Sequence, residues 1–221
     1  MSTIYSESSR EQVMEQRSEA WFKARLGKVT ASKIHDIMIK TKVGESTYKT
    51  KYRLQLVTER LTGKVVPMFM NDAMKHGVEY EDEAKLEYAN RNKLLVGTDL
   101  TDVGMIDHPS IDWSGASPDG MVGDEGLIEI KCPQPITHTT TIETGEINKR
   151  YIHQMQWQMS CTGRKWCDFV SYHPDFPDDL KLFVKRVPRD NELIARLEEE
   201  VSTFVQEVNF KIKTIKENLN G

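Results

Sequence analysis

Two carboxylates and a lysine near the middle of the chain have side-chain types and spacing that suit metal-assisted hydrolysis. Asp119 is followed, after nine intervening residues, by Glu129, and Lys131 lies two residues further on. Carboxylate oxygens are the ligands that Mg²⁺ prefers, and Mn²⁺ is an alternative ion for such a site. A bound ion of this kind can activate water and relieve the charge on a phosphodiester under attack. Lys131 could act there as a base or stabilise the developing charge, and the pattern leaves both roles open.

Predicted strands bring these three residues together. Glu129 and Lys131 share one face of a strand predicted at residues 126–131, and the neighbouring isoleucines point into an apolar core on the other face. A tight turn joining it to a strand predicted at residues 115–122 would place Asp119 near Glu129. The alternative is that Asp119 is a turn residue and that Glu129 and Lys131 form the solvated side of an edge strand, because this motif is weak when taken alone.

The spacing of apolar residues predicts the elements around this motif. Helical spacing predicts helices at residues 10–24, 34–38, 48–61, 70–90 and 149–161, and a long amphipathic helix from Asn191 onward of about 40 Å. Short apolar runs predict further strands at residues 94–96, 103–106, 166–172 and 180–187. Prolines and threonines after Cys132 predict an irregular connection. This order indicates the α/β class, with a mixed β-sheet covered on both faces by helices and one domain over residues 1–221.

Composition restricts the kind of protein. The net charge of −4 argues against a protein that coats its whole surface with DNA phosphate, although positive charge can still be concentrated in a channel. No apolar run is long enough to span a bilayer, and the polar start lacks the apolar stretch of a signal peptide. Three cysteines form no CxxC pair and leave an odd thiol, which suits a reducing compartment. We therefore expect a cytoplasmic protein without a membrane segment.

Four segments in a fixed order carry a resemblance to a known family. They are Trp21–Gly27 with Val29–Ser32, Gly77–Glu81, Ser117–Gly120 with Leu127–Pro133, and Tyr151–Gln156. In these segments the chain resembles the lambda-exonuclease and YqaJ-type viral recombinase family of the PD-(D/E)XK nuclease superfamily. The resemblance implies a restriction-endonuclease-like fold. It also implies a Mg²⁺-dependent, ATP-independent 5′-to-3′ exonuclease that releases 5′-mononucleotides from linear double-stranded DNA.

The same resemblance implies partners. It implies a ring-shaped homotrimer that threads duplex DNA, prefers 5′-phosphorylated ends and leaves a 3′ overhang for a single-strand annealing protein in phage-type recombination. Two other functions remain open at this stage: an endonuclease or repair nuclease acting on nicks or flaps, and a non-catalytic module that binds DNA ends.

Metal ligands follow from the resemblance residue by residue. Asp119, Glu129 and the backbone carbonyl of Ile130 match direct ligands, and Glu81 matches a third acidic group. Glu81 lies on a predicted helix rich in carboxylates, so the alternative is that it belongs to a solvated, charged face of that helix.

Substrate-binding residues are implied in the same way. Arg25, Thr30 and Ser32 resemble the pocket for the terminal 5′-phosphate, where a guanidinium fork and hydroxyls near a helix start would receive an anion. Either hydroxyl could instead only cap the helix. Ser117 is also assigned to substrate binding.

A later helix and one methionine complete the predicted site. Gln154 and Tyr151 match residues near the scissile phosphate, and they share a helical face with Gln158. Met74 matches an apolar wedge that splits the terminal base pair, with core packing as its alternative. The segment after Pro133 lacks an arginine that the family pattern carries, which leaves the grip on the duplex behind the reaction site undetermined.

Overall fold

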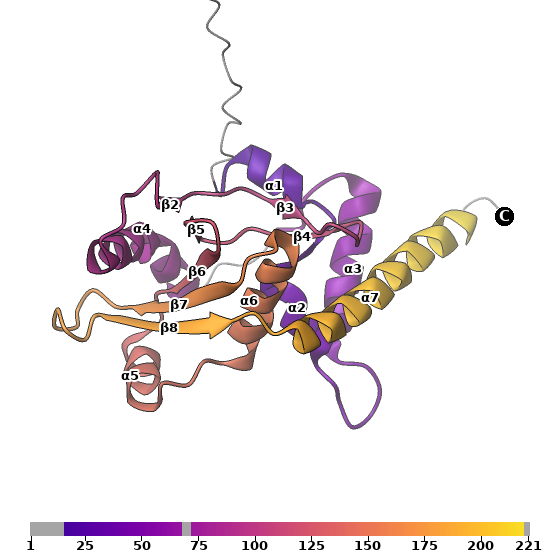
Figure 1. Ribbon diagram of the computed structural model, residues 1–221. Coiled ribbons are helices and arrows are strands. Elements are labelled where there is room, and N and C mark those ends of the chain that lie inside the picture. The colour runs from indigo at the N-terminus through magenta and orange to yellow at the C-terminus, as the bar shows by residue number, and fades with distance from the viewer. Residues whose placement is uncertain (1–15, 68–71, 219–221) are drawn as a thin grey trace, which may run out of the picture.

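A mixed five-stranded sheet lies at the centre of the computed structural model, which describes residues 16–67 and 72–218 (Figure 1). Its strand order is β2-β5-β6-β7-β8, in which β6 and β7 run parallel and the other neighbours are antiparallel. The strands are β2 (Leu100–Thr101), β5 (Gly120–Val122), β6 (Gly126–Lys131), β7 (Trp166–Tyr172) and β8 (Leu182–Pro188). The predicted hairpin between β5 and β6 is confirmed, with Gly120 opposite Ile128.

A second, three-stranded sheet takes up part of what the sequence predicted as one strand. Its order is β1-β4-β3, and its strands are β1 (Val29–Thr30), β3 (Ile106–Asp107) and β4 (Ser114–Ala116). The prediction of a single strand at residues 115–122 was therefore wrong, because β4 joins the small sheet and β5 joins the central one. Pro118, which has no N–H to donate to a ladder, lies between them. Ser117 and Asp119, on either side of Pro118, thus belong to the segment that connects the two sheets.

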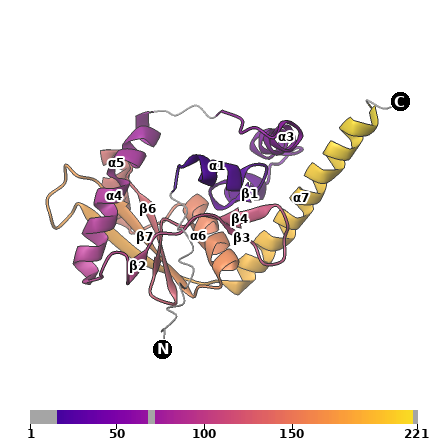
Figure 2. The same cartoon turned by 90° about the horizontal axis from the view of Figure 1, so that it is seen from above.

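Helices cover both faces of the central sheet, as predicted, with α4 on one face and α6 on the other (Figure 2). On β6, Ile128 and Ile130 belong to the cluster beneath α4, whereas Leu127 packs with Met155 and Met159 of α6. The helices are α1 (Glu19–Arg25), α2 (Ile34–Met38), α3 (Thr47–Thr62), α4 (Asp72–Asn92), α5 (Pro135–Thr144), α6 (Lys149–Thr162) and α7 (Asn191–Asn218), with a short 3₁₀ helix, η1 (Ala31–Lys33). No helix within these described ranges has the length and apolar character needed to cross a membrane.

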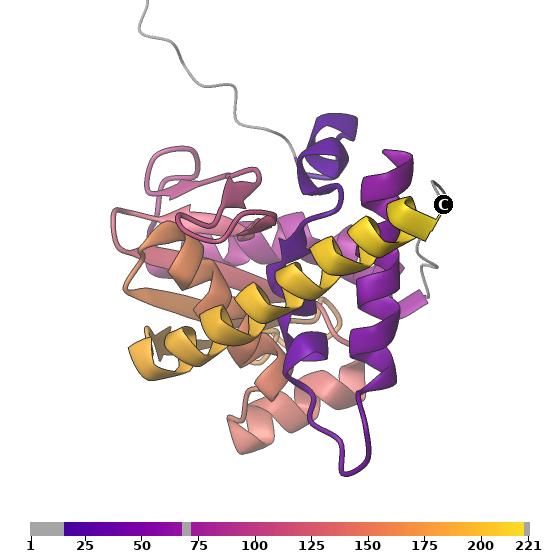
Figure 3. The same ribbon diagram turned by 90° about the vertical axis from the view of Figure 1, so that its right-hand side faces the viewer.

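The predicted long C-terminal helix is confirmed as α7, whose 28 residues span about 42 Å. Figure 3 shows α7 running diagonally across α3, and its last turns reach beyond the sheet in Figure 2. Leu197, Val201, Phe204 and Val208 recur at helical spacing and are fully buried. Their burial joins α7 to α2, α3 and α6 in one apolar cluster.

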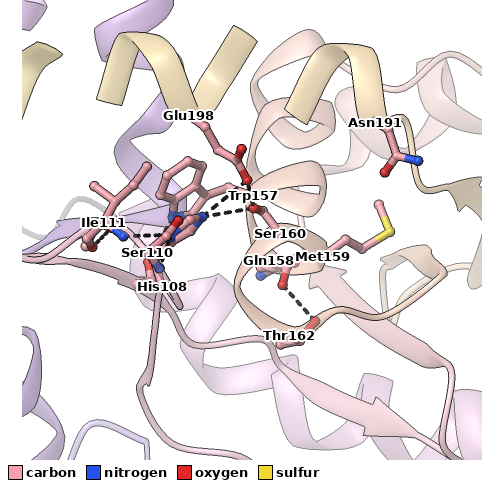
Figure 4. A network of polar contacts seen from close by, with 12 residues as sticks. His108, Ser110, Ile111, Trp157, Gln158, Met159, Ser160, Thr162, Asn191 and Glu198 are labelled. Carbon is pink, nitrogen blue, oxygen red and sulfur yellow. Dashed lines mark hydrogen bonds and ion pairs between the residues drawn. The ribbon is translucent and has the colours of Figure 1, made fainter. Parts of the chain in front are cut away.

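A chain of polar contacts, buried at His108 and Ser160, ties α7 to α6 and to the small sheet (Figure 4). His108 Nδ1 accepts the N–H of Ile111 at 3.1 Å, so Nε2 carries the proton and donates to Ser160 Oγ at 3.0 Å. Ser160 Oγ donates in turn to Glu198 Oε1 at 2.5 Å. The Trp157 ring stacks on the His108 ring with centroids 4.8 Å apart. Because each donor in this chain has an acceptor, the chain holds three segments of the protein together.

Two predicted strands before β4 were wrong. Residues 94 and 95 are irregular, Val96 makes only an isolated bridge to Leu100 around a turn at residues 97–99, and β3 begins no earlier than Ile106. The Asp99 carboxylate closes the turn by accepting the N–H of Leu95 at 2.9 Å, while its own N–H donates to the Leu95 carbonyl. Such a local side-chain bond competes with a strand ladder, and it outweighs the apolar run here.

The irregular connection predicted after Cys132 was also wrong, because residues 135–144 form helix α5. Pro135 is the first helical residue, where its missing N–H costs nothing. The hydroxyls of Thr139, Thr140 and Thr141 each donate to the carbonyl four residues earlier, at 2.9 to 3.0 Å. These bonds satisfy the polar groups of residues that otherwise favour strands.

The first predicted helix, at residues 10–24, is confirmed only in its second half. Helix α1 starts at Glu19, after Ser18 accepts the N–H of Trp21 at 3.2 Å, and residues 1–15 lie outside the described part of the chain. Gly27 adopts a φ of +68° just after this helix, which only glycine does without strain.

The start of β6 gives a test of this packing. A Cβ on Gly126 would overlap the indole ring of Trp166, so Gly126→Ala should lower the free energy of unfolding by about 1–3 kcal/mol. The control is Gly77→Ala in α4, where nothing lies within 4 Å of the added Cβ and helix propensity should raise stability by up to about 1 kcal/mol. Urea denaturation followed by far-ultraviolet circular dichroism measures both, and equal effects of the same sign would contradict this packing.

Candidate active site

A cleft of about 640 Å³ gathers most of the residues singled out from the sequence. It is bordered by residues of α1, η1, α4 and α6 and by the end of β6. Of the predicted site residues, those that border it are Arg25, Ser32, Glu81, Ser117, Asp119, Glu129, Ile130, Lys131, Tyr151 and Gln154. Segments more than 100 residues apart in the chain therefore meet at one cavity.

Glu129 is the most completely enclosed of these residues, with 0% of its surface exposed. Its Oε1 accepts from Gln154 Nε2 at 2.6 Å, its Oε2 accepts from Gln158 Nε2 at 2.6 Å, and the Lys131 ammonium forms an ion pair with it. Burying a carboxylate without partners costs free energy, and these three donors offset that cost for Glu129. The alternative of a solvated edge strand is excluded, because β6 lies between β5 and β7.

Asp119 reaches β6 from the loop before β5. Its Oδ2 accepts the N–H of Ile130 at 2.7 Å. Burial, reinforced by the negative charge of Glu129, raises the pKa of Asp119 to about 7, although Lys131 and this N–H act against the shift. The N–H and C=O of a strand residue point to the same side, so the Ile130 carbonyl opens toward Asp119 as well. Two carboxylates and one carbonyl thus face the same corner of the cleft.

Lys131 is the cation closest to the two acids. Burial acts to lower the pKa of its ammonium, but the charges of Glu129 and Asp119 outweigh burial and raise it above the ordinary value. The ammonium also lies 5.2 Å from the centroid of the Tyr151 ring, on the side of α6. Lys131 is therefore charged, which is the form that stabilises developing negative charge.

Glu81 on α4 borders the same cleft and is paired with Arg17, which the sequence did not single out. Only 16% of the Glu81 side chain is exposed, so the alternative of a solvated face does not describe it. Burial and then the charge of Asp119 raise the pKa of Glu81, while Arg17 counteracts both. The segment that carries Arg17 is held in place by Gln16, whose Nε2 donates to the Pro118 carbonyl at 2.7 Å.

The donor chemistry of this corner fits a divalent cation. Asp119, Glu129 and Glu81 are hard oxygen groups, and two of them form ion pairs, Glu129 with Lys131 and Glu81 with Arg17. Within the described residues, no three acidic, histidine or cysteine side chains converge closely enough to enclose an ion directly. A Mg²⁺ ion keeps several waters and binds through one or two carboxylates. Asp119, Glu129 and the Ile130 carbonyl are the groups that would hold it.

Arg25 lies on a neighbouring wall of the cleft. Its Nη1 donates to Ser117 Oγ at 3.2 Å, and Trp21 Nε1 donates to the same oxygen at 3.1 Å. The guanidinium stacks 4.0 Å above the Trp21 ring. Burial lowers the pKa of Arg25 although nearby acidic groups oppose this. Trp21 was within a segment that carried the family resemblance, but its stacking on Arg25 could not be read from the sequence.

Of the other two predicted phosphate-pocket residues, Ser32 borders the cleft and Thr30 does not. Ser32 is exposed at the cleft, whereas Thr30 is 7% exposed, does not border it and donates its N–H to Tyr52 Oη at 3.1 Å. Neither hydroxyl makes a capping hydrogen bond to η1. The side chain of Met74 lies outside the described residues, so its predicted role as a wedge stays a prediction.

The chain is similar to proteins of known family and structure. The sequence profile of the YqaJ-like viral recombinase domain matches residues 20–165 of the chain. The protein belongs to this family. A search of curated proteins gave no match. This member of the YqaJ-like family is similar to the crystal structure of an alkaline exonuclease, LHK-Exo, from Laribacter hongkongensis. The two share 48% identity over 92% of this chain and 98% of that one, with a TM-score of 0.83.

Two further structures extend the likeness. LHK-Exo in complex with dAMP matches this YqaJ-like protein with the same identity, coverage and TM-score. A phage-related exonuclease from Haemophilus somnus 129PT is 18% identical over 85% of this chain and 96% of that one, with a TM-score of 0.67. The second likeness concerns the fold alone. The predicted family and the predicted α/β fold class are thus confirmed.

The raised pKa of Asp119 makes stability depend on pH in a testable way. An unfolded aspartate ionises near pH 3.8, while folded Asp119 keeps its proton up to about pH 7, so the wild type loses stability as pH rises between these values. Asp119→Asn cannot ionise, and its Oδ1 can still accept from Ile130. In EDTA, its advantage in free energy of unfolding should therefore grow from pH 5 to pH 8.

Urea denaturation at the two pH values measures this advantage. Asp124→Asn, which removes an exposed carboxylate from the β5–β6 turn, is the control for the change in net charge. An Asp119→Asn advantage of the same size at both pH values would contradict the assignment.

Proposed function

We propose that this protein is a divalent-metal-dependent, ATP-independent exonuclease that degrades the 5′-ended strand of linear double-stranded DNA. The ion is Mg²⁺, with Mn²⁺ as an alternative, and the products are 5′-mononucleotides and a 3′ single-stranded overhang. The observation that carries the proposal is the cluster of Asp119, Glu129 and Lys131 at one corner of the cleft, with Arg25 and Ser32 on its walls.

Each group has a role that its surroundings support. Asp119, Glu129 and the Ile130 carbonyl would hold the cation, which when bound supplies an activated water and relief of phosphate charge. Glu81 is the further acidic group beside them, and it is paired with Arg17. Lys131 stabilises the negative charge that develops on the phosphate, and Gln154 positions Glu129 through its amide. Tyr151 lies beside Lys131 on the wall that meets the substrate.

The relatives support the reaction class and the size of the product. The protein with 48% identity is an alkaline exonuclease, and it was crystallised with dAMP, a deoxynucleoside monophosphate. We assign the 5′-phosphate of the strand end to Arg25, Ser32 and Ser117, and the terminal base pair to Met74. Each cut would then release one such nucleotide. Endonuclease or flap activity and non-catalytic end binding are the competing functions.

The biological setting follows from the family. We propose that one domain over residues 1–221 carries the activity, that three copies form a ring around the duplex, and that the protein acts in the host cytoplasm. The 3′ overhang would pass to a single-strand annealing protein for phage-type recombination. A light-scattering mass corresponding to three chains of 25.5 kDa each would support the ring.

Removing Lys131 tests the proposed chemistry. Lys131→Ala should slow the degradation of linear duplex in Mg²⁺ by about 100-fold or more. The substitution removes the ammonium group at the end of β6 that pairs with Glu129. Lys165→Ala, which removes a surface lysine paired with Glu125, is the control and should keep the wild-type rate. Undiminished degradation by Lys131→Ala would contradict the role assigned to Lys131.

The choice of substrate tests the direction and the 5′ end. Linear duplex should be degraded to mononucleotides from the 5′ end, and a covalently closed circle should remain intact. Ends bearing 5′-hydroxyl should be degraded at least about tenfold more slowly than 5′-phosphorylated ends, because a charged hydrogen bond is lost. Arg25→Lys should narrow that difference, since a lysine cannot present the fork. Cleavage of the circle would indicate an endonuclease, and equal rates on both ends would contradict the phosphate pocket.

A further inference from the structure

In the described part of the chain four cationic side chains border the cleft, and they differ in how well they are paired. Arg17 is paired with Glu81, Lys131 with Glu129, and Arg25 both donates to Ser117 and stacks on Trp21. Arg150 is the fourth. Among the described residues its side chain has one acidic contact, Nη2 to Asp36 Oδ1 at 3.5 Å, and half of the side chain is exposed. The cation of Arg150 is therefore the most available of the four to an incoming anion.

Asp36 holds Arg150 only loosely. The Asp36 side chain is 6% exposed, and its other oxygen, Oδ2, already forms an ion pair with Lys33 at 3.1 Å. Its charge is thus balanced without Arg150, and a contact at 3.5 Å is at the outer limit of a hydrogen bond. This contact occupies only one of the five N–H groups of the Arg150 guanidinium.

The place of Arg150 on α6 also needs an explanation. Lys149 and Arg150 are the first two residues of this helix, and its first turn contains no acidic residue. Cations are unfavourable at the positive end of a helix dipole, so these residues do not serve the stability of α6. An anion brought to this end would be favoured both by the dipole and by the guanidinium.

Arg150 is also aligned with the reaction centre. Arg150 and Gln154 lie four residues apart on one face of α6, on the order of 5–6 Å between their Cβ atoms. Gln154 in turn donates to Glu129. The wall formed by α6 therefore presents Arg150 one helical turn away from the acidic corner.

We propose that Arg150 binds a backbone phosphate of the DNA strand in the cleft, next to the phosphate that reacts at Asp119 and Glu129. This inference rests on the proposed function. The contact is to phosphate alone, so it is independent of base sequence and sensitive to salt. Arg150 would thus contact the strand from α6, whereas Arg25 is on α1 and Lys131 is on β6.

The test is the salt dependence of binding to a 5′-phosphorylated duplex oligonucleotide, measured by fluorescence anisotropy in EDTA so that no metal-dependent hydrolysis occurs. Arg150→Ala should weaken binding by about tenfold at low salt. Between about 50 and 200 mM salt, the slope of log Kd against log salt should fall by about one, the value for one lost phosphate contact. Arg150→Lys should keep the slope and recover part of the affinity, because it keeps the charge but not the fork.

Lys149→Ala is the matched control, because it removes the same charge one residue earlier from a side chain that does not border the cleft. It should keep the wild-type slope. The inference is overturned if Arg150→Ala and Lys149→Ala have the same affinity and slope while the wild type binds the duplex. A lower melting temperature of Arg150→Ala with an unchanged slope would also overturn it, since Arg150 would then serve only Asp36. A wild type that neither binds nor degrades the duplex would overturn the proposed function itself.

Discussion

The buried carboxylate of Glu129 is the interaction on which the rest of the site depends. A charge with no exposure to solvent is tolerated only with close donors, and here they come from two elements, Lys131 on β6 and the amides of Gln154 and Gln158 on α6. The two glutamines lie one turn apart, so α6 can satisfy both carboxylate oxygens in one register only. That register also decides which residues of α6 reach the cleft wall.

The position of Asp119 follows from the division of the β-strands. The ladder between β5 and β6 ends at the pair Gly120 and Ile128, and beyond it the chain crosses toward the small sheet. The N–H of Ile130 would be left without a strand partner there, and the Asp119 carboxylate takes that place. The acidic corner therefore lies where strand pairing stops, which leaves backbone and carboxylate oxygens open to the cleft.

Charge in the cleft is balanced locally and not by the protein as a whole. The chain carries a net charge of −4, yet its cleft is bordered by Arg17, Arg25, Lys131 and Arg150 beside three acids. Pairs of opposite charge in a partly enclosed cavity are screened less than surface charges are. An acidic protein can in this way present a cationic path to a phosphate backbone while its outer surface repels it.

Local sequence spacing by itself determined most of the elements and the pairing that brings Asp119 to Glu129. The helices at α4, α6 and α7 and the β5–β6 hairpin follow from which side chains recur on one face. Helix α5 did not follow, because its threonine hydroxyls are satisfied within the helix in a way that composition does not reveal.

Only the tertiary structure decided which polar side chains of the cleft contact one another. The pairing of Arg17 with Glu81, of Gln158 with Glu129 and of Arg25 with Trp21 depends on packing between separate elements, and the place of Arg150 in the cleft depends on how α6 lies against α2. Periodicity records which face of a helix or strand is covered. It does not record which residue covers it, and the partners of a buried charge are set by that contact.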